Sequence, residues 1–140
     1  MRGKGLNTTV QAVFLAALMV VAGCAEQQEQ QSGRDYTVRG QVRQLPRPAN
    51  PAAGGFFVSH EAIDDWVGRD GKVVGMDPMM MSFEVAEGVS LEGLQRGDMI
   101  EFTLHVDWRA STPVEITAIR KLPPGTRLVF REAKPPRDQE

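Results

Sequence analysis

The sequence predicts an all-β domain, a small closed barrel of five strands that follows an N-terminal secretion signal. Two observations predict this fold class. Several short segments alternate apolar and polar residues, which is the pattern of strands with one buried face. Proline-rich stretches and Asp-Gly or Gly-Asp pairs separate these segments and mark turns.

The N-terminus has the organisation of a bacterial lipoprotein signal. Arg2 and Lys4 precede an apolar run over residues 10–22, which is shorter than the roughly 20 residues that a membrane-spanning helix needs. The run closes with Val-Ala-Gly before Cys24, which resembles a lipobox. We therefore expect residues 1–23 to be a signal peptide and Cys24 to carry the lipid anchor. An ordinary signal peptide with an incidental Cys is the alternative.

The mature chain would start at Cys24 and comprise 117 of the 140 residues, enough for one domain. Residues 24–35 are polar and predict a flexible tether, and residues 123–140 predict a largely flexible C-terminal extension. Without Arg2 and Lys4 the chain has 14 basic and 18 acidic residues, a balance that argues against a nucleic-acid partner. Its single Cys leaves no disulfide within the domain, so the fold must depend on its apolar core.

Each strand is predicted from its alternation and its boundaries. The clearest alternation turns Ile100, Phe102, Leu104, Val106 and Trp108 inward. Residues 128–130 could add a sixth strand or simply pack against the domain. The five predicted strands span residues 36–45, 56–60, 81–85, 99–108 and 114–121.

The connections between the strands complete the topology. Three prolines predict a loop over residues 45–51, and Asp70-Gly71 predicts a tight turn. Ser90 could cap one short helical turn that carries Leu91 and Leu94. Five strands with a helical turn between the third and fourth indicate a barrel of the OB type over residues 36–122. A β-sandwich is the rival, although it usually has about seven strands.

Four of the five methionines in the mature chain lie within residues 76–81. Thioether sulfur is a soft ligand that selects Cu(I), and by the same logic Ag(I). Met79 and Met81 would share one face of a strand, Met76 could supply a third sulfur, and His60 could add an imidazole from the neighbouring strand. The alternative is core packing, because this pair has the same parity as Phe83. A metal site requires the pair to lie at the mouth of the barrel.

The sequence also resembles the CusF-like family of periplasmic copper- and silver-binding domains. The most specific elements are His60 followed by Ile63, and the Met79, Met81 and Phe83 alternation. The other matching stretches are Tyr-Thr-Val-Arg-Gly at 36–40, Val-Ser at 58–59, Met-Asp-Pro at 76–78 and Leu-Gln-Arg-Gly-Asp-Met-Ile-Glu-Phe at 94–102. The resemblance implies an OB-like barrel in which His60, Met79 and Met81 ligate Cu(I) or Ag(I).

The sequence departs from that family in two places. Met76 stands where relatives can carry a Trp that covers the ion, although some relatives also carry Met there. About eight additional residues follow His60 and include Trp66, which could fold back over the ion or anchor its own loop. His105 and Asp107 share the outward face of a strand and are more simply interpreted as solvated than as a second site.

The sequence thus predicts a non-enzymatic protein that is anchored to a membrane and faces the periplasm or the cell exterior. We expect a monomer that binds Cu(I) or Ag(I) as a metallochaperone or buffer and meets a transient protein partner, an exporter or a cuproprotein. The alternative function is a metal-free OB-type module that binds a protein or glycan in the cell envelope.

Overall fold

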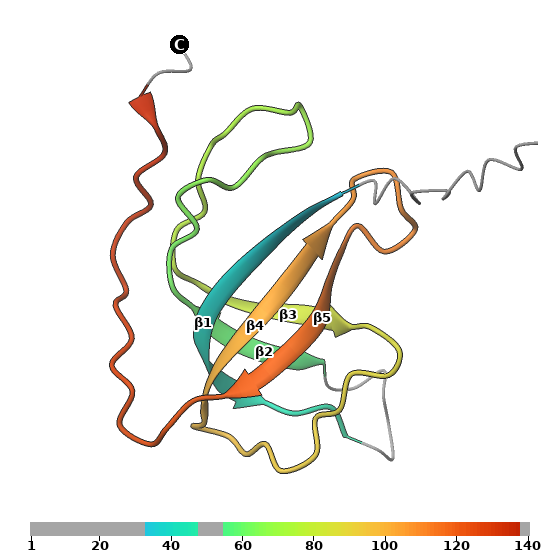
Figure 1. Cartoon of the computed structure of the whole chain (residues 1–140), viewed down its shortest axis with the longest axis vertical. Coiled ribbons are helices and arrows are strands. Elements are labelled where there is room, and N and C mark those ends of the chain that lie inside the picture. Colours follow the sequence, from blue (N-terminus) through green and yellow to red (C-terminus); the bar gives the residue numbers. More distant parts are fainter. Residues whose placement is uncertain (1–32, 48–54, 138–140) are drawn as a thin grey trace, which may run out of the picture. The chain divides into compact units, whose positions relative to one another are not determined.

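Figure 1 shows the computed structural model of the chain, which describes residues 33–47 and 55–137. The predicted signal peptide, the predicted lipid anchor at Cys24 and nearly all of the predicted tether lie outside the described residues. No helix within the described ranges is long and apolar enough to cross a membrane.

The described chain folds into a closed barrel of five strands, which confirms the predicted all-β class and OB-like architecture (Figure 1). The strand order around the barrel is β1-β2-β3-β5-β4, and β4 pairs back onto β1. β3 and β5 pair in parallel, whereas all other pairs are antiparallel. Because these five strands close the barrel among themselves, no other segment is needed to complete it. The strands are β1 Arg34–Gln44, β2 Phe56–His60, β3 Met80–Val85, β4 Met99–Val106 and β5 Val114–Lys121.

The long strand β1 serves two neighbours and passes closest to β2 at Gly40. It pairs with β4 from Arg34 to Gln41 and with β2 from Gly40 onward. A Cβ atom at Gly40 would lie 2.6 Å from Val58 Cγ1 and 2.7 Å from the backbone oxygen of Ser59. Glycine therefore permits the close contact of the two strands at the point where β1 faces His60, the last residue of β2.

The core lies where the alternation predicts it. In β4, Ile100, Phe102, Leu104 and Val106 are all buried, and the intervening residues are more exposed. Partners from every other strand complete the core, including Tyr36, Val58, Phe83 and Ile116. His60 is the one polar side chain buried among the described residues.

The predicted helical turn after β3 is replaced by hydrogen-bonded turns. The Ser90 hydroxyl accepts a hydrogen bond from the Glu92 amide at 3.1 Å, as in the start of a helix, and the Leu94 amide donates to the Leu91 carbonyl at 3.2 Å. Gly93 then adopts a left-handed conformation with φ of +78°. A left-handed residue interrupts a right-handed helix, so the segment turns instead of coiling further.

Two segments extend from the barrel beside β2 and β3. Residues 61–76 form an irregular hairpin with isolated bridges between Ile63 and Met76 and between Val67 and Val73. Residues after Leu122 run as extended chain (Figure 1), and no sixth strand forms within the described part. The sequence did not indicate the hydrogen bonds that this C-terminal segment makes to the hairpin, and its mobility stays a prediction.

Candidate metal centre

The candidate ligands lie on the two arms of one long hairpin, which runs from β2 through the irregular residues 61–79 to β3. The register pairs Val58 with Met81 and Ser59 with Met80. One step further, the His60 amide donates a hydrogen bond of 3.1 Å to the Met79 carbonyl. Met79 therefore lies across from His60, and the second strand is the neighbour of the methionine strand, as predicted.

The same register places His60, Met79 and Met81 on one face of the hairpin. Val58 and His60 are two residues apart in β2 and are both fully buried, so this face points into the barrel. Directly opposed residues have Cβ atoms about 5 Å apart, and diagonal neighbours about 7–8 Å apart. A methionine side chain is long and unbranched, so either sulfur can span such a distance.

Met76 joins the same hairpin beyond an irregular step. Its amide and carbonyl both form hydrogen bonds of 2.9 Å with Ile63. Ile63 is buried, and Met76 is partly buried against the same core. The structure thus brings all four predicted ligands onto one continuous hairpin. Met76 lies beyond the other three, at the next pair of hydrogen bonds along the hairpin.

Burial decreases along the methionine strand towards its N-terminal end. Phe83 is buried, Met81 is partly buried against the core, and Met79 is 46% exposed. The pair therefore lies at one end of the barrel and not in its middle, which is the condition that a metal site requires. Met80 points to the opposite face and is 62% exposed.

The imidazole of His60 has one satisfied and one unsatisfied nitrogen. Nδ1 lies 2.7 Å from the backbone oxygen of Glu61. Because a carbonyl can only accept, Nδ1 carries the hydrogen, and Nε2 of the neutral ring has a free lone pair. Nε2 is buried and has no hydrogen-bond partner. Buried polar atoms are rarely unpaired, so this nitrogen fits a metal ligand better than a satisfied structural histidine.

Burial also favours the neutral form of this ring. Desolvation lowers the pKa of His60 below its ordinary value of 6.5, and the hydrogen bond to Glu61 partly opposes this change. The ring of Phe83 lies edge-on, with 6.1 Å between the ring centroids. A neutral imidazole in apolar surroundings, close to thioethers, is a donor set that suits a soft monovalent ion.

Trp66 lies in the core and anchors its loop. Its ring packs against Tyr36 at 5.0 Å and against Trp108 at 5.9 Å between centroids. The Tyr36 hydroxyl accepts a hydrogen bond from the Val67 amide at 3.0 Å. Gly40 is the β1 residue opposite His60, and Tyr36 lies four positions before it, about 13 Å along the strand. Trp66 therefore packs at a part of β1 that is distant from His60. These contacts favour the loop-anchor interpretation of Trp66.

The second candidate pair does not assemble into a site. His105 Nδ1 lies 2.7 Å from Asp35 Oδ1, and the Asp107 carboxylate accepts a hydrogen bond from the Arg109 amide at 2.9 Å. Within the described residues no group of three or more His, Cys, Asp and Glu side chains could hold a metal ion.

Sequence reasoning did not assign a role to Glu61, which borders the candidate site. Its backbone oxygen orients His60, and its carboxylate forms two hydrogen bonds of 2.9 Å with Arg39. Arg39 also precedes Gly40 on β1. The only sequence signal for a role of Glu61 was its position directly after His60, because its pairing with Arg39 on β1 could not be predicted from the spacing of the two residues.

A five-stranded OB-type barrel with His and Met side chains gathered on one hairpin defines a class of small soft-metal-binding domains. Residues 35–121 match the family described as copper binding periplasmic protein CusF. The match covers more than half of the chain, and the protein belongs to this family. The family binds copper in the periplasm and is not a family of enzymes. Comparison with curated proteins and with solved structures finds no match.

Proposed function

We propose that this protein captures Cu(I), or Ag(I), outside the inner membrane and acts as a metallochaperone or metal buffer. His60, Met79 and Met81 are the proposed ligands, and Met76 is a third sulfur within reach. The observation that carries the proposal is the buried, unpaired Nε2 of His60 on the strand directly beside Met79. Family membership supports copper as the ion.

The donor set explains the choice of ion. Thioethers bind soft monovalent ions and take no proton at ordinary pH, and imidazole binds well only when neutral. Hard cations such as Mg²⁺ and Ca²⁺ prefer oxygen ligands, which the inward face of this hairpin does not offer. Copper and silver share the required softness, so the experiment below compares them directly.

The graded exposure of the ligands suits transfer between proteins. Met79 is nearly half exposed, whereas His60 is fully buried. A partner with its own soft ligands could replace Met79 first and the buried imidazole last, so that the ion is never free. We therefore propose a transient protein partner, an exporter or a cuproprotein, and a monomeric carrier.

The proposed tether would keep this metal exchange close to a membrane. Lipidation at Cys24 would hold the barrel close to a membrane through residues 25–35 while leaving its orientation free. Multiple acyl chains anchor a protein stably, whereas one does so only marginally. This part of the proposal comes from the sequence alone, and mass spectrometry of the mature N-terminus tests it.

The test of function is competition for Cu(I) with a chromophoric chelator under reducing conditions, repeated with Ag(I). The measurement uses the chain from Glu26 to Glu140, which contains the whole closed barrel. We expect one ion per chain, and loss of binding in the variant Met79→Leu/Met81→Leu. Met80→Leu is the matched control, because Met80 points to the opposite face.

Absence of binding, or equal binding by the double variant, would return the methionines to a packing role. The alternative would then be a metal-free module for a protein or glycan. A surface groove of about 560 Å³, lined in part by Met79, Met80 and Phe130, would be the place to look for such a partner.

A further inference from the structure

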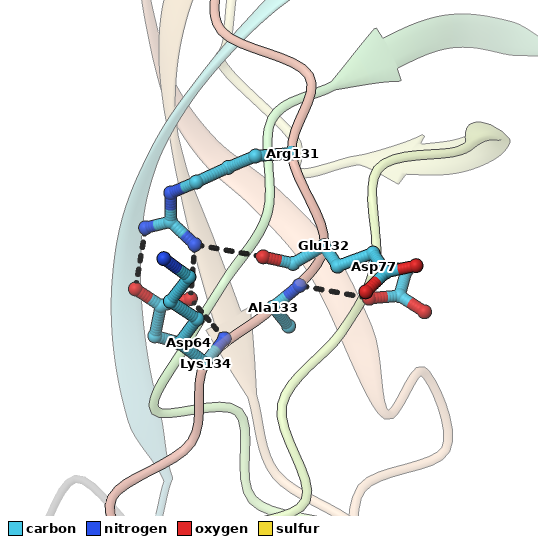
Figure 2. A network of polar contacts seen from close by, with 6 residues as sticks. All are labelled: Asp64, Asp77, Arg131, Glu132, Ala133 and Lys134. Carbon is cyan, nitrogen blue, oxygen red and sulfur yellow. Dashed lines mark hydrogen bonds and ion pairs between the residues drawn. The ribbon is translucent and has the colours of Figure 1, made fainter.

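The C-terminal segment crosses the hairpin that carries the proposed ligands. We call residues 128–135 the C-terminal strap. They lie outside residues 35–121, which match the family, so the strap is a feature of this chain that the family does not account for. Figure 2 shows its central contacts, in which strap groups meet carboxylates of the hairpin.

The strap is attached to the arm that begins at His60. The Val129 amide donates a hydrogen bond of 2.6 Å to Glu61 Oε1. Arg131 contacts Asp64 with both guanidinium nitrogens, Nη1 at 2.8 Å and Nη2 at 2.6 Å. The Lys134 amide adds a bond of 2.7 Å to the same carboxylate. Such two-pronged pairs fix orientation as well as distance.

The strap is also attached to the opposite arm, next to Met76. The Ala133 amide donates a hydrogen bond of 2.8 Å to Asp77 Oδ1 (Figure 2). A Cβ atom built on Gly75 would lie only 3.0 Å from Ala133 Cβ and 3.3 Å from Pro135 Cδ. The Ala133 and Pro135 side chains of the strap therefore pack directly onto the chain where the methionine arm begins.

These contacts form a connection between the two arms that the strand ladder itself lacks. Between the His60–Met79 and Ile63–Met76 hydrogen bonds the ladder is irregular. The strap spans this region from outside, and its bound carboxylates follow His60 on one arm and Met76 on the other. The hydrogen bond from Arg131 also lowers the pKa of Asp64 to about 2, so this carboxylate is charged at neutral pH.

We propose that the C-terminal strap is a positioning element of the metal site, which holds the His60 arm against the methionine arm and slows the release of Cu(I). This inference rests on the proposed function for its metal-dependent part. Arg131, Asp64 and Asp77 act through the backbone of the hairpin and touch no ion themselves.

The first test measures the rate at which Cu(I) leaves the protein for a chelator, by stopped flow. Arg131→Ala should accelerate release about two- to fivefold, the range expected from loss of one exposed ion pair. Arg131→Lys should restore part of the effect, because it keeps the charge and loses the two-pronged contact. Arg127→Ala is the matched control: it removes an exposed arginine from the same segment, and that residue has no ion pair among the described contacts.

A second variant that ends at Thr126 removes the whole strap and keeps every strand of the barrel. It should release Cu(I) faster than Arg131→Ala. The denaturant midpoint of both variants without metal should stay close to that of the unaltered chain, which separates positioning from general stability.

A metal-free measurement keeps the two proposals distinguishable. The Ile63 and Met76 amides each donate a hydrogen bond to the carbonyl of the other residue across the arms. Their hydrogen exchange should quicken in both strap variants and stay unchanged in Arg127→Ala. If Cu(I) binds and neither release nor exchange changes, the strap proposal is wrong and the proposed function stands. If the unaltered chain binds no Cu(I), the proposed function is wrong.

Discussion

Replacement of His60 by leucine separates a ligand histidine from a structural one. A buried polar atom without a partner costs about 1–3 kcal/mol, and a satisfied hydrogen bond contributes about 0.5–1.5 kcal/mol. In His60→Leu the unpaired Nε2 disappears, and so does the bond from Nδ1 to the Glu61 oxygen. The difference predicts that the metal-free variant is as stable as the unaltered protein, or more stable by up to about 2 kcal/mol.

The assay is urea unfolding without metal and again with Cu(I) held by a chelator at a fixed free concentration. Val58→Ala is the control, because Val58 is equally buried on the same face of β2, and it should lose roughly 2 kcal/mol from lost apolar contact and the cavity left behind. Cu(I) should stabilise the unaltered protein, by about 2.7 kcal/mol at a hundredfold excess over its Kd, but not His60→Leu. A metal-free His60→Leu that is destabilised by more than about 1 kcal/mol would show that the imidazole holds the fold, and the reasoning would be refuted.

Three further predictions follow from the same geometry. Burial lowers the pKa of His60, so the unfolded chain binds more protons than the folded chain below pH 6.5. Stability and Cu(I) affinity should therefore both fall as the pH drops through the lowered pKa. A pH midpoint of Cu(I) binding at or above 6.5 would contradict this prediction. Gly40→Ala would place a methyl group 2.6 Å from Val58 Cγ1, and thermal melting should report a loss of about 1–3 kcal/mol; an unchanged melt would mean that the strands are not so close. Mild peroxide should oxidise the exposed Met79 and Met80 first, and peptide mass spectrometry should link the loss of Cu(I) binding to Met79 alone.

The strands were predictable because a barrel wall has one buried face. Each inward residue of β4 from Ile100 to Val106 is buried as the alternation requires. The prediction of a helical turn was wrong, because it depended on Ser90 and two leucines, and these residues do not indicate the backbone conformation of Gly93. That residue is left-handed here, and glycine adopts either hand without a signature in the surrounding sequence.

The placement of the candidate ligands was predictable from the sequence, whereas the surroundings of the His60 ring were not. The soft side chains and the strand connection indicated that His60 and the methionines would be neighbours. That Nε2 is buried and unpaired could not be predicted, because it depends on how the side chains pack around His60, such as the edge-on ring of Phe83, and on the strand register that places Gly40 opposite it. The strap was beyond reach for a similar reason, since Arg131 pairs with an aspartate 67 residues earlier and no local pattern marks that acid among the others.

The position of the candidate site at the barrel end has a consequence for a carrier. Where metal ligands constitute the core, as in small zinc domains, loss of the ion unfolds the chain and the binding energy is also folding energy. Here the core consists of apolar side chains from all five strands, and of the four proposed ligands only His60 is fully buried. The barrel would therefore stay folded without the ion, and a partner would need to compete only with the ligands themselves. Ligand exchange could begin at the exposed sulfur of Met79 while the strap holds the two arms in register, so the rate of transfer would depend on the hairpin and not on unfolding of the domain.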